Sequence, residues 1–223
     1  MKKNKLCYLC GQREADSFDH VPPKNLFPKD FQKKGYKIPA CSECNNLLHL
    51  DEEYIRDRFS IVGQNHTARE VFLNGTKKSY LRPYETTKRV TKLDLIKRDM
   101  IPLAIKSPQG ILIGNATGIK IDSKRVERVS IKIVKGLYYH HFEKIIPSNY
   151  IFHVYFDPPN WLPELLEKPS PIINRFGDAF CYKGTLTQGD MFMGIWWLSF
   201  YASLGLIVVV ENQNNNKLLD NTP

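Results

Sequence analysis

Four of the five cysteines in this 223-residue chain form two C-x-x-C pairs, Cys7 with Cys10 and Cys41 with Cys44, and thirty residues separate the pairs. A C-x-x-C turn brings two sulfurs to one metal ion, and two such turns complete a tetrahedral four-thiolate site. Four thiolates leave no coordination position for water or substrate. The spacing therefore predicts a structural Zn²⁺ that folds a unit of about 60 residues, a size whose own core is marginal.

The cysteines also indicate the compartment. Five are too few for a disulfide-stapled secreted domain of this length, and neither pair lies in the βαβ pattern of a redox C-x-x-C. The start MKKNK is basic, but the apolar segment of a signal peptide does not follow it. We therefore expect a reducing, cytoplasmic setting in which the paired cysteines bind metal.

Polar residues of catalytic type lie between and just after the cysteine pairs. Asp19 and His20 are adjacent, and two prolines that favour an extended turn follow shortly after them. Asn45 directly follows the last paired cysteine, so binding of both turns to one zinc would carry it towards Asp19 and His20. Carboxylate and amide oxygens suit Mg²⁺ or Mn²⁺. Asn46 is an alternative ligand, and in a purely structural interpretation Asp19 caps a turn while His20 packs in a small core.

The order C-x-x-C, Asp-His-x-x-Pro, C-x-x-C-Asn resembles the HNH (His-Me finger) endonucleases with a structural zinc, over about residues 5–60. The resemblance implies a ββα-metal unit in which His20 is the general base and Asp19 and Asn45 hold one catalytic Mg²⁺ or Mn²⁺. It implies hydrolysis of phosphodiester bonds in nucleic acid, with DNA favoured, and no small-molecule cofactor. The alternative function is a non-catalytic zinc module that binds nucleic acid.

Charge supports a polyanionic partner without identifying it. The net charge is +9, and residues 60–100 carry nine Lys and Arg against four Asp and Glu, so more than half of the excess lies there. Such a stretch can hold a nucleic-acid backbone through its phosphates. The 42% hydrophobic content is enough for a packed core and excludes a wholly disordered chain.

The sequence predicts an α+β protein in four parts. They are a zinc-stapled HNH unit (1–60), a basic connector (61–100), an α+β domain of unknown role with a mostly antiparallel sheet (101–211) and a disordered tail (212–223). Apolar spacing predicts a helix over residues 45–59, with the acids at 51–53 on a solvated face. It predicts a second helix over residues 123–142 with Ser123 as N-cap, and two short strands around Asn115. The second domain could bind substrate, sense a partner or mediate oligomers.

One apolar run allows two interpretations. Met191–Val210 contains 20 residues without a charge, which is long enough for a membrane span. Its ends are β-branched and aromatic, however, and Ser199, Ala202, Ser203 and Gly205 in the middle are typical of a turn. We therefore predict two buried strands and do not expect a membrane partner.

Overall fold

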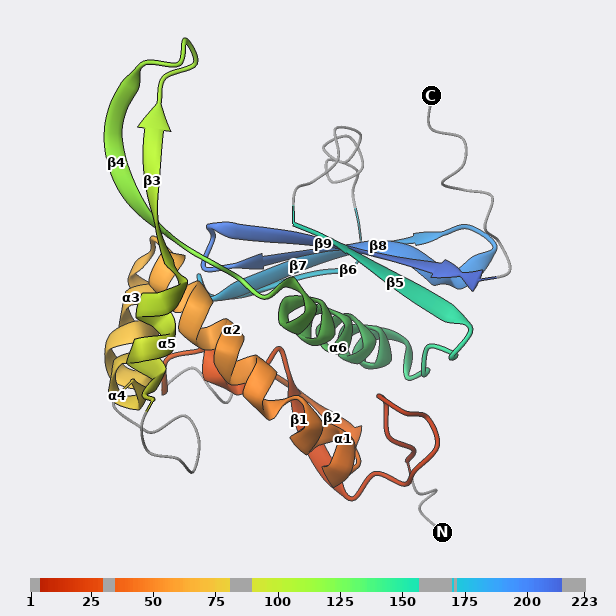
Figure 1. Cartoon of the computed structure of the whole chain (residues 1–223). Coiled ribbons are helices and arrows are strands. Elements are labelled where there is room, and N and C mark those ends of the chain that lie inside the picture. Colours follow the sequence, from red (N-terminus) through yellow and green to blue (C-terminus); the bar gives the residue numbers. More distant parts are fainter. Residues whose placement is uncertain (1–4, 30–34, 81–89, 157–169, 171, 214–223) are drawn as a thin grey trace.

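The apolar run Met191–Val210 folds into two neighbouring strands, β8 (Asp190–Phe200) and β9 (Leu204–Asn212) (Figure 1). They belong to a five-stranded antiparallel sheet in a computed structural model that describes residues 5–29, 35–80, 90–156, 170 and 172–213. The strand prediction is confirmed, and the interpretation as one membrane-spanning helix is wrong. In the described part of the chain, no helix is both long and apolar enough to cross a membrane.

The sheet has the strand order β5-β9-β8-β7-β6. The remaining strands are β5 (Tyr150–Tyr155), β6 (Ile172–Phe176) and β7 (Phe180–Thr187). Along β8, Trp196, Leu198 and Phe200 are buried on one face, as the period of two requires.

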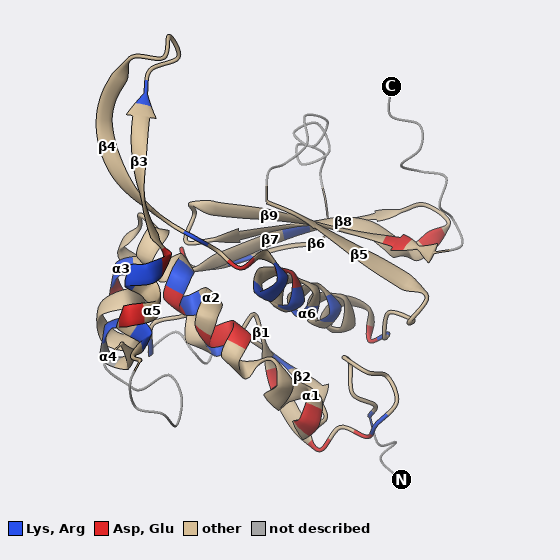
Figure 2. Ribbon diagram, in the orientation of Figure 1, with Lys and Arg blue, Asp and Glu red and all other residues tan. Residues whose placement is uncertain are grey.

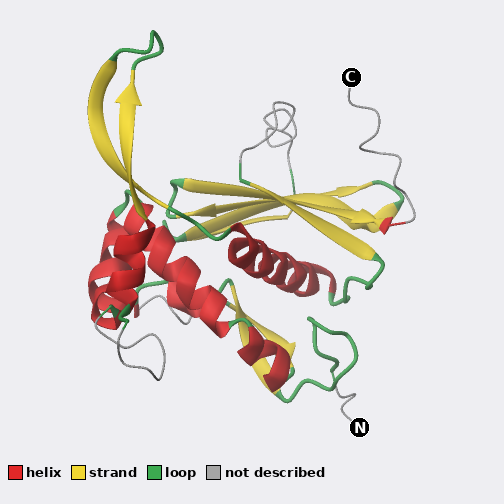
Figure 3. Cartoon of the chain, viewed as in Figure 1, coloured by secondary structure: helices red, strands yellow, loops and turns green. Residues whose placement is uncertain are grey.

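The helix α6 (Ser123–Phe142) covers that face of the sheet (Figure 3). Its buried stripe includes Val126, Val129, Ile133 and Leu137, as the 3.6-residue period predicts. The predicted cap is wrong by one residue: the Asp122 side chain, not Ser123, accepts the N–H of Arg125 at 3.4 Å. The aspartate carboxylate reaches the first turn from the residue before the helix begins.

The cysteine-containing part forms a hairpin followed by two helices. β1 (Ser17–Val21) pairs antiparallel with β2 (Tyr36–Ala40), so that His20 lies opposite Lys37 and Asp19 opposite Ile38. A short 3₁₀ helix, η1 (Lys24–Leu26), follows β1. The predicted helix over residues 45–59 is present in two segments, α1 (Ser42–Leu47) and α2 (His49–Val62), with Leu48 at the break.

α6 also contacts this hairpin, on its side away from the sheet. A Cβ added at Gly136 would lie 2.5 Å from Cγ2 of Val21, so the absence of a side chain lets α6 approach β1 closely. One hydrophobic cluster contains residues from the hairpin, α6 and the sheet. The chain is therefore α+β with mostly antiparallel sheets, while the division at residues 60, 100 and 211 stays a prediction.

The described residues of the stretch 61–100, predicted as a basic connector, lie mostly in short helices. These are α3 (His66–Val71), η3 (Phe72–Thr76), α4 (Lys77–Ser79) and α5 (Lys92–Asp99). Ala68 and Val71 of α3 join the hydrophobic cluster. Arg82, Lys88 and Arg89 of the basic stretch lie outside the described residues.

A second hairpin, β3 (Met100–Lys106) and β4 (Leu112–Ile119), extends from the helices away from the sheet (Figure 1). The prediction of two strands around Asn115 is wrong, because Asn115 lies within β4 and pairs with Ala104. The turn lies instead between Ser107 and Ile111, where Gly110 has a φ of +85°. Most of the tail predicted to be disordered, residues 214–223, lies outside the described residues.

Candidate metal centre and active site

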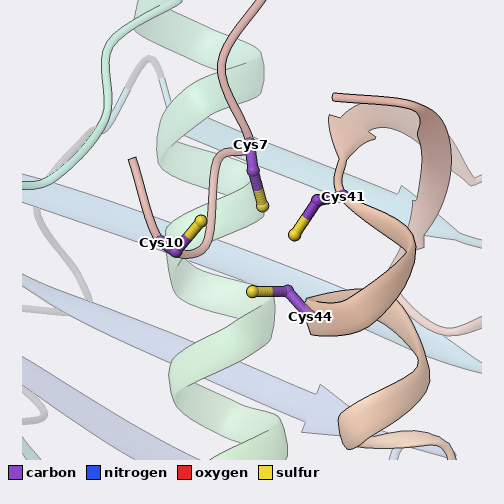
Figure 4. Close-up of side chains that lie close together, drawn as sticks. All are labelled: Cys7, Cys10, Cys41 and Cys44. Atoms are coloured by element: carbon purple, nitrogen blue, oxygen red, sulfur yellow. The ribbon is translucent and has the colours of Figure 1, made fainter. Parts of the chain in front are cut away.

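The four paired cysteines converge from the first cysteine loop and from the start of α1 (Figure 4). Their Sγ atoms all lie within 4.8 Å of one another, and none of the four is in a disulfide. A tetrahedral Zn²⁺ with Zn–S bonds of about 2.3 Å would need sulfurs about 3.8 Å apart. The set can therefore hold a metal ion such as zinc after a small contraction.

Backbone hydrogen bonds shape the first cysteine loop. The N–H of Cys7 donates to the carbonyl of Arg13 at 2.8 Å, and the N–H of Gly11 donates to the carbonyl of Cys7 at 2.8 Å. Gly11 has a φ of +66°, a conformation that glycine adopts without steric cost. The second pair lies at the start of α1, where Cys41 is the N-cap residue.

The surroundings of the sulfurs favour the thiolate form at some of the four cysteines and disfavour it at others. Burial raises the pKa of the Cys10 thiol, but backbone N–H groups of Arg13 and Gln12 outweigh it and lower that pKa to about 6. Burial raises the pKa of Cys44 to about 12. The guanidinium of Arg13 lies 3.3 Å from Cys44 Sγ and binds Glu43 at 2.5 Å. Metal binding would release the remaining thiol protons.

Asp19, a predicted metal ligand, faces the interior and is 4% exposed. The hydroxyl of Tyr8 donates to its Oδ2 at 2.6 Å, and the ammonium of Lys132 lies 2.9 Å from the same oxygen. Its Oδ1 accepts the backbone N–H of His20 at 2.7 Å. Carboxylate chemistry suits a hard cation, but each oxygen of Asp19 already has a protein donor.

Lys132 of α6 also pairs with Glu52 of α2, so one ammonium bridges two carboxylates. The Lys132 side chain is 1% exposed. Burial lowers the pKa of Lys132, but the charges of Asp19 and Glu52 outweigh it and raise that pKa above its usual value. Burial raises the pKa of Glu52. Asp19, Glu52 and Lys132 thus form a buried charged cluster, which we call the carboxylate–lysine cluster.

The acids at 51–53 do not form a solvated face, so that expectation is wrong. Asp51 is buried, and its Oδ2 accepts from Nε of Arg128 at 2.6 Å. Glu53 lies 2.5 Å from the ammonium of Lys92. Helical periodicity places these residues on the surface of α2, but α5 and α6 cover that surface.

His20, the predicted general base, is half-buried and precedes the buried Val21 in β1. Burial lowers the pKa of its imidazole, and the nearby charges of Lys24 and Lys37 lower it further. Exposed Phe18 and Lys37 lie on the same side of the hairpin as His20, because side chains alternate along a strand. An imidazole that is neutral near pH 7 can accept a proton.

Asn45 lies beside the same strand. Its side-chain amide donates to the carbonyl of Phe18 at 3.3 Å, which fastens α1 to β1. Asn46 is exposed, and its carbonyl contacts Nδ1 of His49 at 2.6 Å. Of the two asparagines, Asn45 is therefore the one whose side chain reaches the strand that carries Asp19 and His20.

Three residues of this region are missed by sequence reasoning: Tyr8, Glu52 and Lys132. The sequence could have drawn attention to Tyr8, since it is an aromatic residue between the two cysteines of the first C-x-x-C pair. Lys132 precedes Gly136 by one helical turn, and a glycine on a packed helix face indicates close approach of another backbone. The ion pair between Lys132 and Asp19 has no local signature in the sequence, because more than a hundred residues separate the two.

The chain matches no protein-family model, no curated protein and no solved structure. A function must therefore be argued from the chemistry of these residues alone.

Proposed function

We propose that this protein is a metal-dependent nuclease of the HNH type that hydrolyses phosphodiester bonds of nucleic acid, with DNA favoured over RNA. One observation carries the proposal: His20, whose imidazole pKa is lowered by burial and by Lys24 and Lys37, directly follows Asp19 in a hairpin that Asn45 fastens to the helix that begins after Cys41 and contains Cys44. In this proposal the cysteine cluster holds zinc and has a structural role only.

The proposed chemistry uses His20 as the general base. Its imidazole takes a proton from a water molecule as the water oxygen attacks phosphorus, and the bond to the 3′-oxygen breaks. When bound by Asp19 and Asn45, Mg²⁺ or Mn²⁺ supplies charge stabilisation at the phosphate and the leaving oxygen. Burial and the charges of Lys24 and Lys37 lower the pKa of His20, which favours its proton-accepting form.

The surface around His20 suits a polynucleotide. Lys37 is exposed directly across the hairpin from His20, and its ammonium can bind a phosphate. Phe18, which is 63% exposed, presents a ring on which a base can stack. Neither contact depends on the base sequence, so the proposed binding is not sequence-specific.

A second candidate function is a zinc module that binds nucleic acid without cutting it. The burial of Asp19 and its contacts with Tyr8 and Lys132 favour this alternative, because a carboxylate with these partners can serve structure alone. It predicts a gel shift with steep salt dependence and no cleavage in Mg²⁺ or Mn²⁺.

The deciding experiment is a cleavage assay with Mg²⁺ or Mn²⁺ on a panel of single-stranded, duplex and branched DNA and RNA. We expect His20→Ala to lose about 10²–10⁴-fold in rate, as removal of a general base does, with unchanged zinc content. His66→Ala is the matched control, because His66 is an exposed histidine on α3. Cleavage by His20→Ala at the wild-type rate would refute the assignment, and absence of cleavage by wild type on every substrate would favour the binding module.

A further inference from the structure

The β3–β4 hairpin stands apart from the hydrophobic core. None of residues 100–119 is buried, and Figure 1 shows the hairpin projecting from the helices, away from the five-stranded sheet. A two-stranded hairpin is marginal in water by itself, and three or more strands with an apolar face are needed for stability. Six large apolar side chains of the hairpin are each at least 44% exposed: Met100, Leu103, Ile105, Ile111, Leu112 and Ile113.

The register of the hairpin shows which backbone groups face away from it. The N–H of Lys120 donates to the carbonyl of Asp99 at 2.8 Å, so the backbone groups of this pair point between the strands. The direction alternates from residue to residue along an antiparallel pair, and the ladder is regular from residue 114 to residue 119. Asn115, Thr117 and Ile119 therefore turn their N–H and C=O groups to the outer edge of β4. Among the described strands, none pairs with that edge.

The two outer edges of the hairpin differ in their capacity to pair. On β3, Pro102 lies opposite Thr117, at an outward position, and it has no N–H to donate. Lys106 adds a charge to the same strand. Proline and lysine are the residues with which natural proteins keep an edge strand from pairing. Residues 112–119 of β4 contain neither a proline nor a charge, so β4 is the open edge.

We propose that this protein is a homodimer in which β4 pairs antiparallel with β4 of a second copy, so that the two hairpins form one four-stranded sheet. A second copy fits the edge because the strand is complementary to itself about a two-fold axis, the commonest symmetry of soluble oligomers. With the axis at Thr117, this residue pairs with Thr117 of the second copy, and Asn115 pairs with Ile119 of the second copy. All the outward residues named above are then used, in about six hydrogen bonds. The inference does not depend on the proposed function.

The side chains of β4 permit this approach. Ala116 and Gly118 alternate with the outward residues and occupy the positions at which two antiparallel strands come closest. Their small size avoids overlap there. Two threonines that face each other at the axis form a favourable cross-strand pair. Because β4 carries no charge, no like charges of the paired strands oppose each other.

The test compares proline substitutions at two residues that face each other in the hairpin, Asn115 in β4 and Ala104 in β3. Both N–H groups point outward, so neither substitution removes a hydrogen bond between β3 and β4. Sedimentation velocity on the full chain over a range of concentrations measures dimerisation, and circular dichroism checks that each variant is folded. We expect wild type and Ala104→Pro to dimerise alike. Asn115→Pro should dimerise at least about tenfold more weakly, since it loses two hydrogen bonds across the axis.

A wild-type protein that stays monomeric refutes the inference, and sedimentation of that monomer with phosphatidylcholine vesicles would assign the hairpin to a lipid surface instead. Equal dimerisation of Asn115→Pro and Ala104→Pro also refutes it, because the contact would then lie on another surface.

If Asn115→Pro does not fold, Thr117→Lys replaces it and Ala104→Lys is the matched control. Two lysines would face each other at the axis in Thr117→Lys, and like charges directly opposite each other destabilise paired strands. We expect Thr117→Lys to dimerise more weakly than Ala104→Lys. Equal dimerisation of these two variants would reject pairing along β4.

Discussion

Tyr8 links the cysteine cluster to the candidate catalytic strand at the scale of a single residue. It lies between two cysteines of the cluster, and its hydroxyl donates to Asp19 at 2.6 Å. Burial and the charge of Asp19 raise the pKa of Tyr8 well above its usual value, so the phenol keeps its proton. Any displacement of the first cysteine loop therefore moves a donor of Asp19.

Zinc content tests the cluster directly. We expect about one zinc per chain, and Cys41→Ser should lose it together with the folded hairpin, since structural zinc sites supply about 10–16 kcal/mol. Metal analysis and thermal melting by circular dichroism measure the two effects. Cys181→Ser is the control, because Cys181 lies in β7 outside the cluster. Equal zinc content in the two variants would contradict the assignment.

At the scale of elements, α6 is the part that positions the site. It contacts both strands of the β1–β2 hairpin and strands β5 and β9 of the five-stranded sheet, and it carries Lys132 and Gly136 on its side towards β1. Figure 2 shows basic positions on α6 and acidic positions on α2. Arg128 and Lys132 of α6 contact Asp51 and Glu52 of α2. The helix thus forms the polar contact with α2 as well as the apolar contact with the sheet.

Gly136→Val tests the close approach of α6 and β1. Its side chain would overlap Val21, so we expect a loss of about 1–3 kcal/mol in the free energy of unfolding, as overpacking of a core produces. Urea denaturation measures the loss. Gly114→Val in β4 is the control, because nothing lies within 4 Å of a Cβ there. An undiminished free energy of unfolding in Gly136→Val would contradict the packing.

Local sequence patterns predict the helices and strands of this fold better than they predict the charged contacts between them. The β-branched and aromatic residues of β8 and β9 and the stripe of α6 identify those elements, because one face of each is buried. The short β6 carries exposed Ile173 and Arg175, so its pattern is too weak to recognise. The basic partners of Asp19 and Asp51 come from α6. A sequence pattern within one segment carries no information on which distant lysine or arginine will contact it.

At the scale of the whole molecule, two histidines near the end of α6 connect this helix to the β1–β2 hairpin and to the five-stranded sheet. The ring of His140 stacks on Tyr36 of β2 with centroids 3.4 Å apart, and Nε2 of His141 contacts the hydroxyl of Tyr182 in β7 at 2.8 Å. Burial lowers the pKa of both imidazoles below their usual value. The contacts among hairpin, helix and sheet therefore contain two histidines that resist protonation.

Stability should consequently fall on acidification. Between the lowered folded pKa and the unfolded pKa of about 6.5, the unfolded chain binds more protons than the folded one, so the free energy of unfolding decreases as the pH falls through this window. We expect a lower urea midpoint at pH 5.5 than at pH 7.5. His140→Phe keeps a ring against Tyr36 but cannot be protonated, so the decrease should be smaller in this variant. An identical decrease in wild type and His140→Phe would exclude a contribution from His140.

The close contact between Gly136 and Val21 limits how the hairpin can be transferred between proteins in evolution. The cysteine-rich hairpin looks like a portable module, but one of its faces is completed by a helix that begins 83 residues after Ala40. A recombination event that moved the hairpin alone would leave Asp19 without Lys132 and would expose Val21 to water. We therefore expect the hairpin and α6 to be inherited together and substitutions in one to be compensated in the other.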